Sequence, residues 1–399
     1  MTINNEHKKL NVPNLRFPEF QGEWEKMRLD AFTERVMRKN KSNQSRLPLT
    51  ISAQYGLVDQ ITFFNKVVAS TDLSNYYLLK KGEFAYNKSY SSDYPWGAIK
   101  RLDNYDQGAL SSLYICFAPQ DNVVSDFILQ YFESPKWHKG ISEIAVEGAR
   151  NHGLLNVAVQ DFFHTYHYVP KDKKEQIKIS KLLMLLDERI STQNKIIEDL
   201  KKLKSAIIEI EYTPNTKTTS PIGDVIEQIS KRNKNNAIQN VLSVSNRQGF
   251  IKQSDQFENR NVASEDTSNY KIVEQNDFAF NPARINVGSI ARLTTFEKGI
   301  VSPMYICFRT QENVAPEYID YFFESKHFYC EIQKRLEGSV RQCLSFEGLC
   351  NIPLSLPSFE MQQLIGKRLF TLGQKVKTET YILELLNKQK QYLLRQMFI

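Results

Sequence analysis

Two stretches of the chain carry apolar residues at helical spacing over a great length. The segment after Pro170 contains no glycine or proline before Pro214, and its apolar residues recur every three or four positions. The segment after Pro357 repeats this spacing. Apolar residues at such intervals form one face of an amphipathic helix. We therefore expect two long helices, over residues 171–212 and 358–399, that pack on each other as an antiparallel or coiled-coil pair.

Helices of this length do more than cap a domain. About 40 helical residues span roughly 60 Å. A small helical subdomain is the alternative, but it would not need two matched helices of this length. We expect the apolar positions to serve packing between the helices and binding of protein partners. The residues predicted to bind partners are Leu182, Leu186, Ile197, Leu200, Leu372, Leu383 and Leu386.

The rest of each half shows shorter runs of both secondary-structure types. EFAYN, AIKRL and SLYICFAP predict strands, whereas VSDFILQYFESPKWHKGI and PEYIDYFFESKHFYCEIQKRL predict helices. Each half is thus expected to be a mixed α+β domain followed by a long spacer helix. The expected order is an N-terminal segment (1–23), a first α+β domain (24–170), a central helix (171–212), a linker (213–221), a second α+β domain (222–357) and a distal helix (358–399).

The two halves of the chain are copies of one module. SNYYLLKKGEFAYN (74–87) aligns without a gap with SNYKIVEQNDFAFN (268–281), and YICF occurs at both 114–117 and 305–308. The offset between matched segments stays between 187 and 194 residues, which indicates duplication. NKSYSSDYPWG in the first copy is three residues longer than NPARINVG in the second. Ordinary loop drift and divergent recognition both explain that difference.

Composition fits a multidomain protein with a mild positive charge. The chain has 399 residues, 41% of them hydrophobic, and a formal net charge of +7. That length exceeds one ordinary core, and the charge permits a polyanionic partner without establishing one. Five cysteines without a CxxC pair fit a reducing cytoplasm and argue against a zinc site. The polar start and the lack of a long apolar run predict a cytoplasmic protein with no signal peptide and no membrane association.

Motifs of common enzymes are absent from the sequence. No two prolines are adjacent, and no GxG, GxxxxGK[ST], HxxxH or HExxH occurs. The usual adenine methyltransferase motif, dinucleotide and S-adenosylmethionine loops, P-loop and histidine metal site are therefore missing. We expect no catalytic residue, metal or cofactor on this chain. A stand-alone methyltransferase or nuclease with unfamiliar motifs stays open, as does a coiled-coil scaffold that binds only proteins.

Basic side chains gather at the same place in both copies. Residues 34–46 hold five cations and one acid, and residues 228–252 hold five cations and no acid, with Asn and Gln interleaved. Lys and Arg neutralise phosphates, while Asn, Gln and Arg can bond base edges. A solvated basic loop is the alternative for either segment alone. The candidates here are Arg38, Lys39, Lys41, Asn43 and Arg46, then Arg232, Asn233, Lys234 and Arg247.

Two further polar regions recur in both copies. One follows the asparagine shared by the aligned segments, and the other is the EGAR-NHG loop with its counterpart GSVRQ. A glycine followed by arginine and an amide at a sharp turn could enter a DNA groove, although an ordinary surface turn explains the pattern as well. The candidates here are Asn87, Lys88, Tyr90, Arg101, Arg150 and His152, then Asn281, Arg284, Arg292, Arg341 and Gln342.

At these residues the chain resembles the specificity subunits (HsdS) of type I restriction-modification systems. NVPNLRFPEFQGEWEKMRL (11–29) is similar to their entry motif, which runs Pro-x-Leu-Arg-Phe-Pro-x-Phe-x-x-x-Trp. Residues 174–204 and 360–398 resemble the family's central and distal spacer helices, and NDFAFNPARINVGSIA (276–291) resembles its recognition strand and loop. The likeness covers essentially the whole chain, but the longer loop of the first copy departs from the second copy's pattern.

The resemblance implies a non-catalytic subunit with two target-recognition domains in a pseudo-twofold frame. Each domain would read one half of an asymmetric, bipartite site in double-stranded DNA, and the paired helices would set the unread gap. The same helices would dock two modification (methyltransferase) subunits that methylate adenine, and two restriction (motor-nuclease) subunits would join them. S-adenosylmethionine, ATP and Mg would then be bound by those partners.

Overall fold

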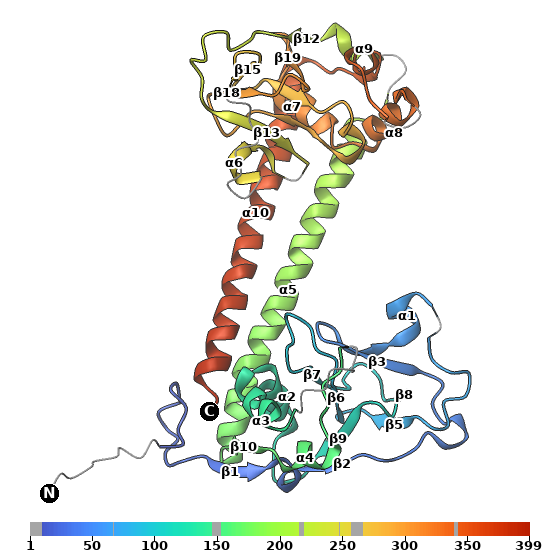
Figure 1. Ribbon diagram of the computed structural model, residues 1–399, viewed down its shortest axis with the longest axis vertical. Helices are drawn as coiled ribbons and strands as arrows, with labels where there is room; N and C mark the ends of the chain where they lie inside the picture. Colours follow the sequence, from blue (N-terminus) through green and yellow to red (C-terminus); the bar gives the residue numbers. More distant parts are fainter. Residues whose placement is uncertain are drawn as a thin grey trace, which may run out of the picture. The chain divides into compact units, whose positions relative to one another are not determined.

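The computed structural model describes residues 10–66, 68–145, 153–214, 219–246, 248–256, 266–338 and 342–399. The chain forms two compact units, one made of the residues up to Gln193 with Ile382–Ile399, the other of Asn194–Tyr381. Two long helices, α5 (Lys173–Glu211) and α10 (Phe359–Gln396), each contribute to both units (Figure 1). The α+β class with two long helices is as expected from the sequence.

Within its described residues, the first unit contains three small sheets and four short α-helices besides the long ones. In sheet order, the strands are β1 (Glu25–Arg28) and β10 (Tyr166–Val169); β2 (Thr33–Arg35), β9 (Ile115–Pro119), β6 (Phe84–Asn87) and β7 (Ala98–Arg101); β4 (Gly56–Asp59), β3 (Pro48–Ser52), β8 (Gln107–Leu110) and β5 (Tyr77–Lys80). The helices are α1 (Gln60–Phe64), α2 (Ser125–Glu133), α3 (His138–Ile144) and α4 (Val159–His164). Only the β3–β8 pair is parallel within the described strands of this unit.

The second unit repeats this arrangement strand for strand. Its sheets are β11 (Thr219–Pro221) and β20 (Pro353–Ser355); β12 (Ile226–Ile229), β19 (Ile306–Thr310), β16 (Phe278–Phe280) and β17 (Ile290–Arg292); β14 (Gly249–Lys252), β13 (Val241–Ser245), β18 (Lys298–Val301) and β15 (Lys271–Glu274). Its helices are α6 (Gln253–Gln256), α7 (Pro316–Phe322), α8 (Lys326–Arg335) and α9 (Phe346–Cys350). Identical strand orders with a parallel β13–β18 pair establish the duplication in three dimensions.

Alternating side chains of the central sheet separate two cores in each unit. In β9, Phe117 packs in the aromatic core with the helices, while the preceding Cys116 packs in the core with the second sheet. The equivalent Phe308 and Cys307 of β19 divide between two cores in the same way. Successive side chains of a strand point to opposite faces, so the shared YICF motif builds both cores at once.

Each predicted helix that follows the YICF strand is two helices. Ser134 ends α2 by donating its hydroxyl to the Tyr131 carbonyl, and Ser325 ends α7 in the same way at Phe322. Both serine oxygens then accept a backbone N–H of the next turn. A serine that satisfies both a last carbonyl and a first amide is a compact helix break.

The ends of the long helices complete the aromatic core of each unit. In the first unit, Ile179 and Leu183 of α5 pack in the same core as Leu394 and Phe398 near the end of the chain. In the second unit, Ile208 and Tyr212 take part in one core with Ile365 and Leu369 of α10. Each core therefore includes the beginning of one long helix and the end of the other.

The entry motif of the chain is an anchor for α5. Arg16 donates from Nε to the Glu175 carboxylate at 2.7 Å, and Trp24 donates its indole N–H to the same group at 3.1 Å. Glu175 is 1% exposed, so these bonds stabilise a charge that would otherwise be costly to bury.

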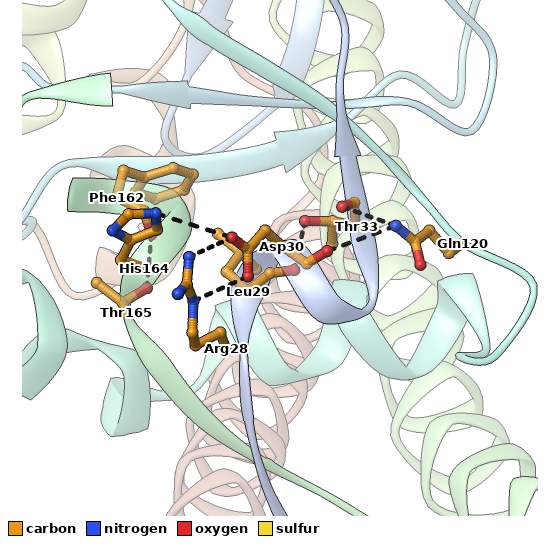
Figure 2. A network of polar contacts seen from close by, with 8 residues as sticks. All are labelled: Arg28, Leu29, Asp30, Thr33, Gln120, Phe162, His164 and Thr165. Atoms are coloured by element: carbon orange, nitrogen blue, oxygen red, sulfur yellow. Dashed lines mark hydrogen bonds and ion pairs between the residues drawn. The ribbon is translucent and has the colours of Figure 1, made fainter. Parts of the chain in front are cut away.

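A polar network closes the first unit around the end of β1. Figure 2 shows the Asp30 carboxylate between Arg28, at 2.5 Å, and His164 of α4, at 3.9 Å. The neighbouring Gln120 donates to the Thr33 carbonyl at 3.2 Å. These contacts join α4 and the turn after β9 to the first strands of the domain.

Candidate nucleic-acid interface

The predicted basic loop of the first unit is closed by a buried asparagine. Asn40, which follows β2, is 0% exposed. Its side-chain N–H donates to the Ser45 carbonyl at 2.8 Å and to the Leu73 carbonyl at 3.3 Å, and its Oδ1 accepts the Ser45 N–H at 2.8 Å. An amide that pairs with both backbone groups of one residue fixes the ends of the loop between them.

The second unit closes its basic loop with the equivalent residue, Asn233. It is 2% exposed, donates to the Ile238 carbonyl at 3.0 Å and accepts the Ile238 N–H at 3.1 Å. Thr267 lies near the same amide, as Leu73 does in the first unit. We therefore remove Asn233 from the predicted DNA contacts, because its side chain builds the loop from inside.

Cations on the near side of each loop are held against the domain. Lys39 donates to the Asn75 carbonyl at 2.8 Å and lies 4.4 Å from the centre of the Tyr77 ring. Its counterpart Arg232 donates to the side chain of Asn269 at 3.0 Å. Both side chains are on exposed residues, so their charge still contributes to the potential over the loop.

Two other predicted residues of the first loop have internal partners. Arg38 pairs with the Glu83 carboxylate at 2.7 Å, which neutralises part of its charge. Asn43 has a positive φ of 51° and its Oδ1 accepts the Leu73 N–H at 2.9 Å. Asparagine tolerates this backbone conformation and can form hydrogen bonds with nearby backbone groups. Asn43, which was predicted to contact DNA, therefore stabilises the conformation of the loop.

The side chains that remain free to meet a ligand form a smaller set. They are exposed, or half-exposed in the case of Lys88, and no hydrogen bond or ion pair joins their side chains to another residue within the described ranges. They are Lys41, Arg46, Lys88 and Tyr90 in the first unit, and Lys234, Arg284 and Gln342 in the second. Lys41 and Lys234 each follow directly after the buried asparagine, so the two units present a lysine at matched positions.

The shared asparagine after the β6 and β16 strands makes a turn in both units. The Oδ1 of Asn87 accepts the Ser89 N–H at 3.0 Å, and that of Asn281 accepts the Ala283 N–H at 3.1 Å. An asparagine that bonds the backbone two residues on mimics a backbone turn. Asn281 is also 7% exposed, so we correct its predicted role from DNA contact to turn formation.

The arginines predicted at the ends of β7 and β17 are structural. Arg101 donates to Asp126 of α2 at 2.7 Å. The equivalent Arg292 pairs with Glu317 and Asp320 of α7 at 2.5 and 3.2 Å. Their side chains are 11% and 9% exposed, so both fasten a strand to the following helix and neither is available to DNA.

Four predicted contacts cannot be placed. Arg150, His152, Arg247 and Arg341 lie outside the described residues, so the EGAR-NHG loop and most of its counterpart stay predictions from the sequence.

The predicted partner-binding residues of the long helices divide into two groups. Leu186, Ile197 and Leu386 are 8%, 7% and 6% exposed, so we correct their role to packing within the chain. The other four predicted residues are more accessible: Leu182 is 37% exposed, and Leu200, Leu372 and Leu383 are half-buried.

Other apolar residues near the beginnings of these helices were missed and are more exposed. Ile177 and Leu185 of α5 are 50% and 55% exposed, and with Met184 they line a shallow groove beside α2. On α10, Leu364 and Phe370 are 39% and 52% exposed. The sequence feature that could have predicted them is the number of apolar positions, which exceeds what one buried face of an amphipathic helix requires.

The two cysteines of the shared YICF motifs are buried and poorly reactive. Burial raises the pKa of the Cys116 and Cys307 thiols to about 12, so both are protonated at neutral pH and are poor nucleophiles. No group of three or more His, Cys, Asp or Glu residues there is arranged to hold a metal ion. No helix in the described ranges has the length and apolarity to cross a membrane.

Comparison with known proteins identifies relatives of this fold. A family model described as the type I restriction modification DNA specificity domain matches residues 214–388. The crystal structure of the type I restriction-modification system S subunit from M. genitalium is similar at a TM-score of 0.57 and 15% identity, covering 97% of this chain and 99% of that chain. A structure described under complex assembly and conformational transition of the type I R-M system is similar at 0.53 and 14% identity, covering 94% and 97%. No curated protein matches the sequence.

Proposed function

We propose that this chain is a member of the type I restriction-modification DNA specificity family, whose model matches residues 214–388, and that it reads a bipartite, asymmetric DNA site with one α+β domain for each half. It is a non-catalytic DNA-recognition subunit. The observation that carries the bipartite proposal is the duplication: the same sheets and the same asparagine-closed loop occur twice, with different side chains around them. Two unlike readers on one chain suit two unlike half-sites.

Recognition would combine phosphate and base contacts. We assign phosphate neutralisation to Lys41 and Lys234, because their ammonium groups are exposed beside matched, rigidly closed loops. Among the exposed residues whose side chains have no partner within the described ranges, Tyr90, Arg284 and Gln342 could form hydrogen bonds with base edges. Phosphate contacts supply affinity for any sequence, and base contacts select the site.

Partner subunits would supply the chemistry. We propose that two modification subunits, which bring S-adenosylmethionine and methylate adenine, dock on α5 and α10, and that two ATP- and Mg-dependent restriction subunits join them. An exposed apolar face at the beginning of each helix supports two equivalent docking places, with Met184 on α5 and Phe370 on α10 at matched positions.

The proposal is tested by activity with and without partners. The purified chain with labelled S-adenosylmethionine and DNA should transfer no methyl group, and adding modification subunits should produce adenine methylation. Methyl transfer by the chain alone would favour the alternative of an atypical methyltransferase. Gel-shift binding to random and selected DNA at two salt concentrations separates both from a protein-binding scaffold, which would bind neither DNA.

Docking can be tested apart from DNA binding. Replacing Ile177 and Leu185 by aspartate should abolish docking at α5 and lower the number of co-purifying modification subunits from two to one, because the docking place on α10 is unchanged. DNA affinity should stay within about twofold, since neither residue is among those assigned to DNA. Lys201→Asp, at an exposed position of α5 that does not line this groove, is the control. Co-purification of two modification subunits with the apolar double variant would place the docking surface elsewhere.

A further inference from the structure

A glutamine is buried one turn into each long helix. Gln176 of α5 and Gln362 of α10 are both 1% exposed. Burying an amide is costly unless its donors and acceptor are bonded. Neither residue contributes to the loops or the apolar faces described above, so each calls for its own explanation.

The two glutamines make the same pair of bonds. Gln176 accepts the Val124 N–H and donates to the Pro170 carbonyl, both at 2.8 Å. Gln362 accepts the Ala315 N–H and donates to the Pro357 carbonyl, both at 2.9 Å.

These bonds join three segments through one side chain. Val124 and Ala315 are the residues that immediately precede α2 and α7. The two prolines lie just before the long helices. Hydrogen bonds to a planar amide are directional, so each glutamine fixes the angle between a long helix and α2 or α7, the helix that follows the central sheet of the same unit. Apolar packing at the same place would fill the volume but would hold the angle less narrowly, with a scatter of about 15–20°.

The same short helix is tied to the edge strand of the central sheet in each unit. Arg101 at the end of β7 pairs with Asp126 of α2, and Arg292 at the end of β17 pairs with Glu317 of α7. A continuous polar connection therefore runs, within each unit, from the central sheet through α2 or α7 to the glutamine and its long helix.

We propose that Gln176 and Gln362 are positioning residues that set the angle of each recognition domain on its helix, and thereby the strictness of the DNA gap length. This rests on the proposed reading of a bipartite site. Half-site bases are read by loop side chains, whereas the distance between half-sites depends on how rigidly each domain is held.

Selection from a random DNA pool tests the proposal with the full-length chain. The probes are the wild type, the double variant Gln176→Met with Gln362→Met, and the control Gln363→Met, which changes an exposed glutamine next to Gln362. Sequenced DNA from each selection gives the half-site bases and the gap between them. Methionine keeps the volume and removes both bonds.

The wild type and the control should select one gap length. The double variant should select the same half-site bases as the wild type. Its preference for the wild-type gap over gaps one base pair longer or shorter should be about tenfold weaker than that of the wild type, as expected from losing buried hydrogen bonds. A folded double variant with unchanged gap preference would overturn the proposal. If melting shows that it does not fold, the milder Gln→Asn pair, which is too short to reach both partners, is selected and judged by the same criterion. A wild type that selects no bipartite site would instead overturn the proposed function.

Discussion

At the residue scale, neighbouring polar residues of the same loop have opposite roles. Asn40 is fully buried and closes a loop, while the following Lys41 is exposed. Sequence reasoning found the right segment because cations cluster there in both copies. It could not separate loop-building amides from free ones, because one partner of Asn40, Leu73, lies 33 residues away in the chain.

The matched lysines give a direct prediction. Lys41→Ala and Lys234→Ala should each weaken binding to all DNA sequences and reduce the slope of log affinity against log salt by about one, because each removes one phosphate contact. Fluorescence titrations at several salt concentrations measure the slope. Arg101→Ala, at a buried ion pair, should leave the slope unchanged in folded protein. An unaltered slope in both lysine variants would exclude these loops from the interface.

A buried histidine makes the first unit sensitive to acid. His167 accepts the Tyr131 hydroxyl at 2.9 Å and donates to Thr165 at 2.8 Å, because the Thr165 hydroxyl proton is already given to Phe162. Burial lowers the pKa of His167 from 6.5 to about 3. The unfolded chain therefore binds an extra proton between these pH values, and stability falls as the pH falls below about 6.5.

We expect the unfolding free energy to drop by about 2 kcal/mol from this group between pH 7 and pH 5. His167→Gln keeps a donor and an acceptor but does not titrate, so its stability should change less over the same range. Urea unfolding at both pH values measures the difference. Equal pH dependence in the variant would show that His167 is not the responsible group.

At the scale of elements, the short strands and long helices were predictable and the breaks were not. YICF, FAYN and AIKR fall on β9, β6 and β7 because apolar and β-branched residues fit a buried sheet. The break at Ser134 was missed although Pro135 follows it, because apolar residues occur on both sides, at Phe132 and Trp137. The buried glutamines of α5 and α10 were missed for a different reason, because a polar residue in a helix is ordinarily exposed.

Two glycines of α10 provide a matched pair of tests. A Cβ on Gly366 would come within 2.7 Å of the Glu317 Cβ on α7, whereas a Cβ on Gly373 would meet nothing within 4 Å. Gly366→Ala should therefore destabilise the chain by about 1–3 kcal/mol through overpacking. Gly373→Ala should stabilise it by about 0.5–1 kcal/mol through helix propensity. Urea unfolding followed by circular dichroism compares them, and equal effects would contradict the close packing of α10 on α7.

At the scale of the whole molecule, the duplication was the most reliable feature of the sequence. The constant offset between copies predicted one fold used twice, and the three sheets of each unit have matching strand orders. The assignment of particular contacts was less accurate, because Arg101 and Arg292 look like free surface arginines until the fold brings acids from α2 and α7 to them. The pattern of apolar positions predicts which face of a helix or strand is buried. The role of a particular polar side chain depends on the neighbours that the fold brings to it.

The central claim is that each α+β domain reads one half of the DNA site by itself. The most direct measurement exchanges residues 24–170 for the first recognition domain of a relative with a different site and maps methylated adenines in a genome that carries the modification subunits. One half-site should change, while the other half-site stays as in the wild type. Alteration of both half-sites, or methylation with no bipartite pattern, would contradict the account.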